Sequence, residues 1–321
     1  MKLKTKIMIG LSALLAGLVV FSFFSKNLFE KPGVRLVDNT EGVDLTQFLE
    51  PGLCREHLPW GVHRVNNVEI GNRVLYLCKS RYASGYDPTI RMPLWTSEVL
   101  NASMLEHLAI GETAGQFIEN QKLPSGMRLN RSDFNNPYFI PGQMASPENM
   151  FTNIKGLNNV QRKERLRKVM DESFLLSNTA PMVAVNMRNG LWFELEKQIK
   201  RWLVNKGELF VVSGPLFLNG KNNGLMGVNK IPIPTHFYKI VIYPRNHGSV
   251  AYIIPNKEIR TQNTIEIINL NNTHSCPQNQ NGWCSLNDFI VPLTEVERIS
   301  GITFFSELAP HFAARIRPNK N

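Results

Sequence analysis

The chain has few charged residues, and this scarcity limits the folds that it can adopt. Asp, Glu, Lys and Arg make up 19% of its 321 residues, whereas it has 22 glycines and 19 prolines. Long helical bundles and coiled coils need more charge and fewer residues that break helices. The composition therefore argues against an all-helical array and favours a loop-rich mixed fold. Intrinsic disorder is excluded, because 43% of the residues are hydrophobic, which is enough for a substantial core.

Acidic residues are fewer than basic ones. The 26 Asp and Glu against 36 Lys and Arg leave a formal net charge of +10. This balance suits an anionic partner such as nucleic acid, phosphate or an acidic membrane surface. Mitochondrial, secreted and assembly proteins are also often basic without binding nucleic acid, so the net charge alone leaves both interpretations open.

Cysteine is scarce as well, with four residues and no CxxC spacing. No second Cys or His pair lies near either pair of cysteines, so the spacing predicts no zinc site. Cys276 and Cys284 close a short polar loop, and we predict a disulfide there because a turn can bring the two Cα atoms within bridging distance. Cys54 and Cys78 can form a bridge only if the first strand folds back beside residues 51–60. A disulfide favours an oxidising compartment.

One long uncharged apolar run, residues 7–24, follows three lysines near the N-terminus. Its length is just sufficient to cross the core of a bilayer. No small-x-small cleavage pattern follows the run, which favours a retained anchor over a cleaved signal peptide. The sequence thus predicts a membrane anchor at 1–26 with the lipid bilayer as a partner, and the remaining chain across the membrane. A polar tether at 27–50, one domain at 51–312 and a basic tail at 313–321 complete the expected organisation.

Periodicity within the expected domain predicts an α+β fold. Short β-like runs bounded by Gly, Pro or Asn occur at 74–78, 209–213, 237–242 and 250–254. Helical periodicity occurs at 160–172, 190–204 and 293–308, and Gly301 is expected to break the last helix.

Six segments follow one another in an order that resembles a known family: 133–150, 173–196, 208–217, 232–242, 251–256 and 297–305. Together they resemble the DNA/RNA non-specific endonucleases, and in particular the mitochondrial endonuclease G group. The resemblance runs from about Leu58 to Leu308. It implies a ββα-metal (His-Me finger) core inside a larger domain with a central mixed or antiparallel sheet.

The resemblance also implies a catalytic motif, Asp-Arg-Gly-His, whose histidine is the general base. In this chain the matching positions carry Ile140, Pro141, Gly142 and Gln143. Three of the four family residues are therefore replaced. An amide has no accessible proton-accepting pKa, so Gln143 can orient a water molecule but cannot take its proton.

The family's magnesium-binding asparagine falls on Arg188 when the alignment is anchored on Trp192 and Glu196, although a register shift could bring Asn189 into play. Asn178 and Glu196 are retained from the family pattern. We expect Gln143, Asn178, Arg188 and Glu196 to converge in one vestigial pocket, where Arg188 pairs with Glu196 and excludes magnesium. No cofactor is then expected, and magnesium is expected only if the site is active.

Purely structural interpretations of the same residues stay open. Asn178 can cap a turn, and Glu196 can be a solvated helix residue with Lys200 four positions later. The basic stretch 162–168 can be a solvent-exposed helix face as well as a phosphate-binding surface.

Our functional hypothesis is a membrane-anchored and catalytically inactive endonuclease-like protein that acts as a structural or binding subunit. The alternative is an active Mg-dependent DNA/RNA endonuclease with a rewired site, and a third interpretation is nucleic-acid binding without cleavage through the basic surface. Partners considered are a protein complex or homodimer. The expected location is the mitochondrial inner membrane with the domain in the intermembrane space, and the alternative is a bacterial inner membrane with a periplasmic domain.

Overall fold

A computed structural model gives the fold of this chain and describes residues 51–102, 105, 115–150, 155–184, 190–246, 248–257 and 285–316. Its longer strands are β2 (Leu75–Cys78), β3 (Ala83–Asp87), β4 (Met92–Asn101), β5 (Phe139–Gln143), β6 (Thr179–Val183), β7 (Glu208–Leu216), β10 (His236–Tyr243) and β11 (Gly248–Pro255). Two-residue strands are β1 (Arg64–Val65), β8 (Leu225–Met226), β9 (Ile231–Pro232), β12 (Ile290–Val291) and β13 (Ile302–Thr303). The α-helices are α2 (Val68–Arg73), α3 (Asn159–Ser173), α5 (Leu191–Lys206), α6 (Leu293–Ser300) and α7 (Pro310–Ile316).

The centre of the fold is a seven-stranded sheet with the strand order β12-β11-β10-β7-β4-β3-β2. All of its strand pairs are antiparallel. The α+β fold class with a central antiparallel sheet is thus confirmed, and the four strands expected from periodicity are all present. Alternation explains this, because each central strand presents one apolar set of side chains to each face of the sheet.

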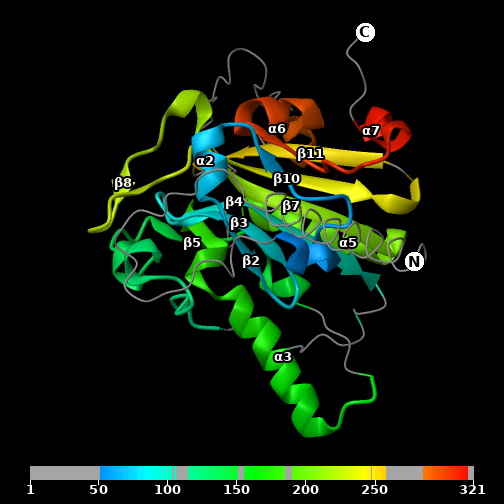
Figure 1. Ribbon diagram of the computed structural model, residues 1–321, viewed down its shortest axis with the longest axis horizontal. Coiled ribbons are helices and arrows are strands. Elements are labelled where there is room, and N and C mark those ends of the chain that lie inside the picture. The colour runs from blue at the N-terminus through cyan, green and yellow to red at the C-terminus, as the bar shows by residue number, and fades with distance from the viewer. Residues whose placement is uncertain are drawn as a thin grey trace, which may run out of the picture. The chain divides into compact units, whose positions relative to one another are not determined.

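Different elements cover the two faces of this sheet (Figure 1). On one face, Tyr238, Ile240 and Ile242 of β10 belong to a core cluster with residues of α6 and α7. On the other face, Phe237 and Val241 belong to a second cluster, which includes residues of α5 and of the β5–β6 pair. Successive residues of β10 therefore point into two separate cores.

Helix α5 packs through a stripe of buried side chains, Trp192, Leu195, Ile199 and Leu203. The ring centroids of Trp192 and Phe237 lie 5.6 Å apart, which places the helix against β10. The expected packing of Trp192 is confirmed, since only 2% of its surface is exposed. The left-handed Gly301, at φ 66°, ends α6 where the sequence predicts a break.

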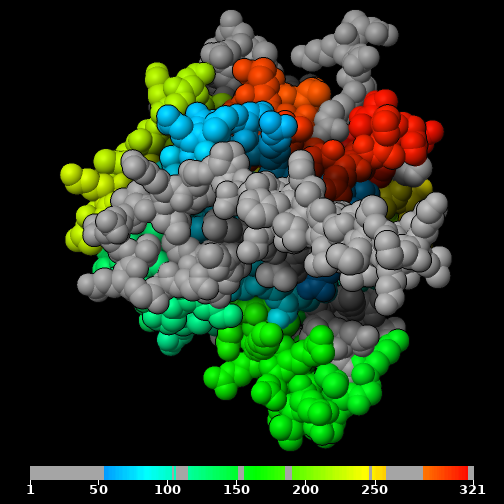
Figure 2. Space-filling model, viewed as in Figure 1, coloured from blue at the N-terminus to red at the C-terminus, as the bar shows by residue number. Residues whose placement is uncertain are grey.

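Helix α3 projects away from the sheet and forms the green projection at the bottom of the surface view (Figure 1 and Figure 2). Its side chains are mostly exposed, and Val169 and Ser173 are its buried residues. A capping box starts it, in which the side chain of Asn158 accepts from the backbone of Gln161 while the side chain of Gln161 accepts from the backbone of Asn158. The helix therefore depends on its cap and its last turn more than on a buried face.

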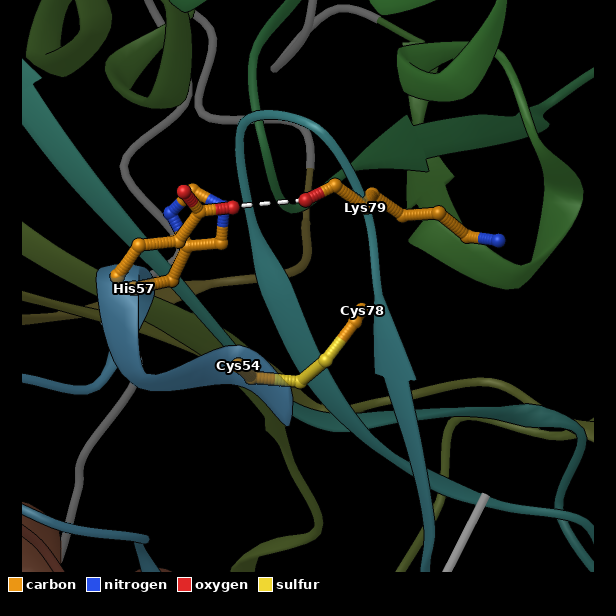
Figure 3. Close-up of a disulfide and its surroundings, with 5 residues drawn as sticks. Cys54, His57, Cys78 and Lys79 are labelled. Atoms are coloured by element: carbon orange, nitrogen blue, oxygen red, sulfur yellow. Dashed lines mark hydrogen bonds and ion pairs between the residues drawn. A yellow bond between two sulfur atoms is a disulfide. The ribbon is translucent and has the colours of Figure 1, made fainter. Parts of the chain in front are cut away.

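A disulfide between Cys54 and Cys78 joins the short helix η2 (Pro51–His57) to the edge strand β2 (Figure 3). Its Cα atoms lie 5.4 Å apart. The His57 ring adds a hydrogen bond, from Nε2 to the carbonyl oxygen of Lys79 at 3.0 Å. Residues 51–60 therefore lie beside β2, as a bridge between Cys54 and Cys78 requires.

Several predicted features lie outside the described residues. These are the anchor and tether at 1–50, the cysteines Cys276 and Cys284, and most of the basic tail. Within the part of the chain that the structure describes, no helix is long and apolar enough to cross a membrane. The anchor, the domain limits and the Cys276–Cys284 disulfide stay predictions.

Candidate functional site

The strand pair β5–β6 forms the frame of the candidate site. Its register pairs Ile140 with Met182, Pro141 with Pro181, Gly142 with Ala180 and Gln143 with Thr179. A Cβ atom on Gly142 would lie 2.5 Å from the Cβ atom of Met182, so this position has to be glycine. The backbone at the motif is thus tightly packed, although three of its side chains differ from the family pattern.

Gln143, at the position of the family's histidine, is an internal residue. Its side chain is 4% exposed, and its Nε2 donates to the carbonyl oxygen of Ser173 at 3.0 Å. Ser173 is the last residue of α3, so this hydrogen bond connects β5 to the end of that helix. Neither Ile140 nor Pro141, both half-buried, offers a charge beside it. The motif therefore supplies an amide donor and no proton acceptor.

Asn178 ends the short helix η7 (Leu176–Asn178) and is fully buried. Its Oδ1 accepts from the backbone nitrogen of Ala145 at 3.0 Å, and its Nδ2 donates to the carbonyl oxygens of Ala145 and Ser173, both at 2.9 Å. The structure therefore brings Asn178 and Gln143 together on one acceptor, the carbonyl of Ser173. Asn178 therefore fixes the backbone that follows β5. Both hydrogens of its side-chain amide and one lone pair of its Oδ1 take part in hydrogen bonds.

Glu196, on α5, is paired with a lysine that the sequence reasoning did not single out. Lys239 Nζ donates to Glu196 Oε1, and the side chains are 0% and 10% exposed respectively. The same ammonium lies 4.2 Å from the centroid of the Trp192 ring. Lys200 instead lies 3.5 Å from Glu148 Oε2. The interpretation of Glu196 as a solvated partner of Lys200 is therefore wrong.

A signal in the sequence could have identified Lys239. It is the one charged residue of β10, whose alternation places it on the same face as Phe237 and Val241. A lysine at a core-facing position of a central strand requires a buried acidic partner. Arg188, which we expected to pair with Glu196, lies outside the described residues together with Asn186 and Asn189, so its position stays a prediction.

A second buried carboxyl group, that of Glu98 on β4, lies in the same region. Asn149 Nδ2 lies 3.2 Å from one of its oxygens and 3.5 Å from the other. Burial raises the pKa of Glu98 to about 8, and the nearby Glu196 raises it too, while Lys239, Asn149 and Arg81 act in the opposite direction. Glu98 is therefore mostly protonated at neutral pH, and Lys239 pairs with Glu196.

Three of the described histidines, His57, His63 and His236, are buried. Burial lowers the pKa of His63 to about 3 and that of His236 to about 4, and burial also lowers the pKa of His57. His63 packs against the rings of Trp95, Phe304 and Phe305. Both ring nitrogens of His236 are buried, and neither has a hydrogen-bond partner among the described residues. No contact recorded in the described ranges brings any of these three rings to Gln143, Asn178 or Glu196.

The described residues also supply only a fragment of a divalent-metal site. Glu196 Oε2 is buried, and no hydrogen-bond partner for it lies within the described part of the chain. No group of three or more His, Cys, Asp or Glu side chains that could hold a metal ion occurs among the same residues. One unpartnered carboxylate oxygen does not make a metal site, so the described residues do not fit a magnesium ion by themselves.

Comparison with known proteins identifies the family of this chain. A family model described as DNA/RNA non-specific endonuclease matches residues 63–311. The chain belongs to the DNA/RNA non-specific endonuclease family. Nuclease C1 of Cunninghamella echinulata var. echinulata is 28% identical over 246 residues, which cover 73% of this chain and 83% of that protein. Mitochondrial endonuclease G of Homo sapiens is 28% identical over 250 residues, which cover 74% of this chain and 71% of that protein.

A solved structure agrees with the family assignment. The crystal structure of the EndoG/EndoGI complex contains a chain that superposes on this one with a TM-score of 0.60 at 23% sequence identity. The match covers 79% of this chain and 92% of that chain, and it shows the same fold. The fold of the DNA/RNA non-specific endonucleases is thus present here, and the placement of Gln143 at the position of the family's histidine stays a prediction.

Proposed function

We propose that this chain is an endonuclease with a rearranged site, which hydrolyses phosphodiester bonds in DNA or RNA. Support comes from its relatives, which are named nucleases and align with more than two thirds of the chain. The observation that carries the proposal is the carboxylate of Glu196. It is retained on α5 and fixed through one oxygen by Lys239, while its other oxygen has no partner among the described residues.

Glu196, Asn178 and Gln143 have different roles in the proposed site. Glu196 offers a buried acceptor to a water molecule, and Asn178 holds the chain after β5 in place. Gln143 has a structural role, because its amide donates to the Ser173 carbonyl and cannot remove a proton.

A second candidate function is binding without cleavage, as a structural or binding subunit. The observation that favours it is the buried amide of Gln143 at the position of the base, since loss of a general base commonly costs about 10²–10⁴-fold in rate. In this case α3 is a candidate contact for nucleic acid. This helix projects into solvent (Figure 2) and carries five basic residues, Arg162, Lys163, Arg165, Arg167 and Lys168.

One assay separates the two candidates. The full-length chain is incubated with supercoiled plasmid or with RNA in Mg²⁺ or Mn²⁺, and strand breaks are measured. We expect cleavage that is lost in Glu196→Gln and kept in Glu194→Gln. Glu194 is the matched control because it lies on the same helix, is partly exposed and pairs with Lys197 at 3.2 Å. Absence of cleavage by the wild type, with salt-sensitive binding to the same nucleic acid, would establish the second candidate.

We also propose a mitochondrial location, with the apolar run 7–24 as an inner-membrane anchor and the domain in the intermembrane space. Several relatives are named as mitochondrial nucleases, and the Cys54–Cys78 disulfide suits an oxidising compartment. In cells that express the full chain, we expect it in the mitochondrial membrane fraction. It should resist protease until the outer membrane is ruptured. Recovery as a soluble matrix protein would refute this location.

A further inference from the structure

Lys239 lies at the junction between the sheet and α5. Its side chain is fully buried on the face of β10 that carries Phe237 and Val241. The ammonium donates to Glu196 Oε1 and lies 4.2 Å from the centroid of the Trp192 ring. Trp192 and Glu196 are four residues apart and therefore neighbours on one face of α5. One cation thus contacts both side chains by which the helix faces this part of the sheet.

The pairing fixes the orientation of the carboxylate. An ammonium with no exposure to water is costly unless a buried anion accompanies it, so the Lys239–Glu196 contact is strongly favoured over separation. A carboxylate is planar, and holding Oε1 limits the direction of Oε2. Oε2 is the oxygen that lacks a hydrogen-bond partner among the described residues. Lys239 therefore determines where the available oxygen of Glu196 points.

Glu98 can compete for the same ammonium. It projects from β4 on the same side of the sheet, and Val211 of β7 pairs with it in register. The charged and titratable groups around Glu98 are Lys239 from β10, Glu196 from α5, Arg81 before β3, and Tyr82. Burial raises the pKa of Glu98 to about 8. Below that pH Glu98 is neutral, and above it Glu98 becomes a second anion beside Lys239.

We propose that Lys239 is a positioning residue that holds the Glu196 carboxylate in its working orientation, and that ionised Glu98 draws Lys239 away from it. This inference rests on the proposed function, because it gives Glu196 its role in cleavage. It assigns to a lysine inside the sheet the control of the Glu196 carboxylate. The control is exerted without any contact between Glu98 and the substrate.

The test follows cleavage by the full-length chain as a function of pH in three variants. Lys239→Met keeps the length of the side chain and removes its charge, and we expect kcat to fall about 100-fold with KM unchanged, as for a displaced catalytic group. Lys200→Met is the matched control, because Lys200 is a partly exposed lysine that pairs with Glu148 and should cleave like the wild type. Glu98→Gln mimics the protonated carboxyl group. It should therefore retain its rate above about pH 8, where we expect the wild type to lose activity.

A second readout does not depend on cleavage. The chain has five tryptophans, so 5-fluorotryptophan labelling gives five ¹⁹F signals, and Trp192→Phe identifies the one of interest. Movement of the ammonium over the ring should shift the Trp192 signal as the pH rises through about 8. We expect this transition in the wild type and not in Glu98→Gln.

These results decide the inference separately from the function. Equal pH transitions of Trp192 in the wild type and in Glu98→Gln would overturn it, as would wild-type kcat in Lys239→Met. If Lys239→Met does not fold, Glu98→Gln still decides. If the wild type does not cleave, the proposed function fails, while a Glu98-dependent transition at Trp192 still supports the positioning by Lys239.

Discussion

At the scale of single residues, Asn178 shows how a retained site residue can have a structural role. Its amide satisfies both backbone groups of Ala145 and shares the Ser173 carbonyl with Gln143. Ala145 lies two positions after Gln143, so Asn178 fixes the position of the motif from behind. A buried amide with three hydrogen bonds to the main chain cannot also bind a substrate through the same atoms. Asn178 can therefore both stabilise a turn of the backbone and lie beside Gln143.

Replacement of this residue has a predictable cost. Asn178→Ala leaves buried backbone groups of Ala145 without partners, and we expect the free energy of unfolding to fall by about 3 kcal/mol. The exposed Asn135 provides a control, and Asn135→Ala should change that free energy by no more than about 0.5 kcal/mol. Urea unfolding with a common m-value measures both. A change at Asn178 as small as the one at Asn135 would show that the three hydrogen bonds contribute little.

At the scale of elements, the disulfide fixes η2 to the exposed edge of the central sheet. Strand β2 is the last strand in the order, and Cys78 is its final residue. The side chain of Cys54 is buried in the core cluster that also contains Trp95 and Phe304. The serine hydroxyl of Ser97 on β4 donates to the His57 carbonyl at 2.9 Å and extends the same attachment inward. The bridge thus closes one edge of the sheet with chain from the start of the domain.

Removal of this bridge should destabilise the domain by a measurable amount. A sequence separation of 24 residues corresponds to a loop-closure contribution of about 3 kcal/mol. We expect dithiothreitol to lower the free energy of unfolding of the wild type by at least that amount. The double variant Cys54→Ala, Cys78→Ser should begin about 3 kcal/mol below the oxidised wild type. Any further loss on reduction of this variant measures the predicted Cys276–Cys284 disulfide, and a wild type that is indifferent to reductant would contradict the prediction.

At the scale of the whole molecule, the sheet separates two cores that have different compositions. The core beneath α6 and α7 contains an apolar and aromatic cluster and the buried His63, whose ring packs against Trp95, Phe304 and Phe305. The core beneath α5 contains the charged groups Glu98, Lys239 and Glu196 as well as its apolar residues. The β5–β6 pair that carries the family motif belongs to this second core. Charged groups are costly to bury unless they are paired, and Lys239 and Glu196 meet this requirement by pairing with each other.

The sequence by itself determined the fold class, the main strands and helices, and the family. Alternation along β10 and the apolar stripe of α5 are local patterns, and the order of the six family segments needs no coordinates. The replacement of the family's histidine by Gln143 stays a prediction from the order of these segments.

Only the tertiary structure decided which side chains meet. Lys239 and Glu196 are 43 positions apart, and Cys54 and Cys78 are 24 positions apart. The alignment of segments named Arg188 as the partner of Glu196, which stays a prediction, but it did not name Lys239, because an alignment gives positions along the chain and not which side chains face one another. Packing of η2 against β2 brings Cys54 to Cys78, and packing of α5 against β10 brings Glu196 to Lys239. The sequence does not reveal these pairs, because each depends on how distant segments pack.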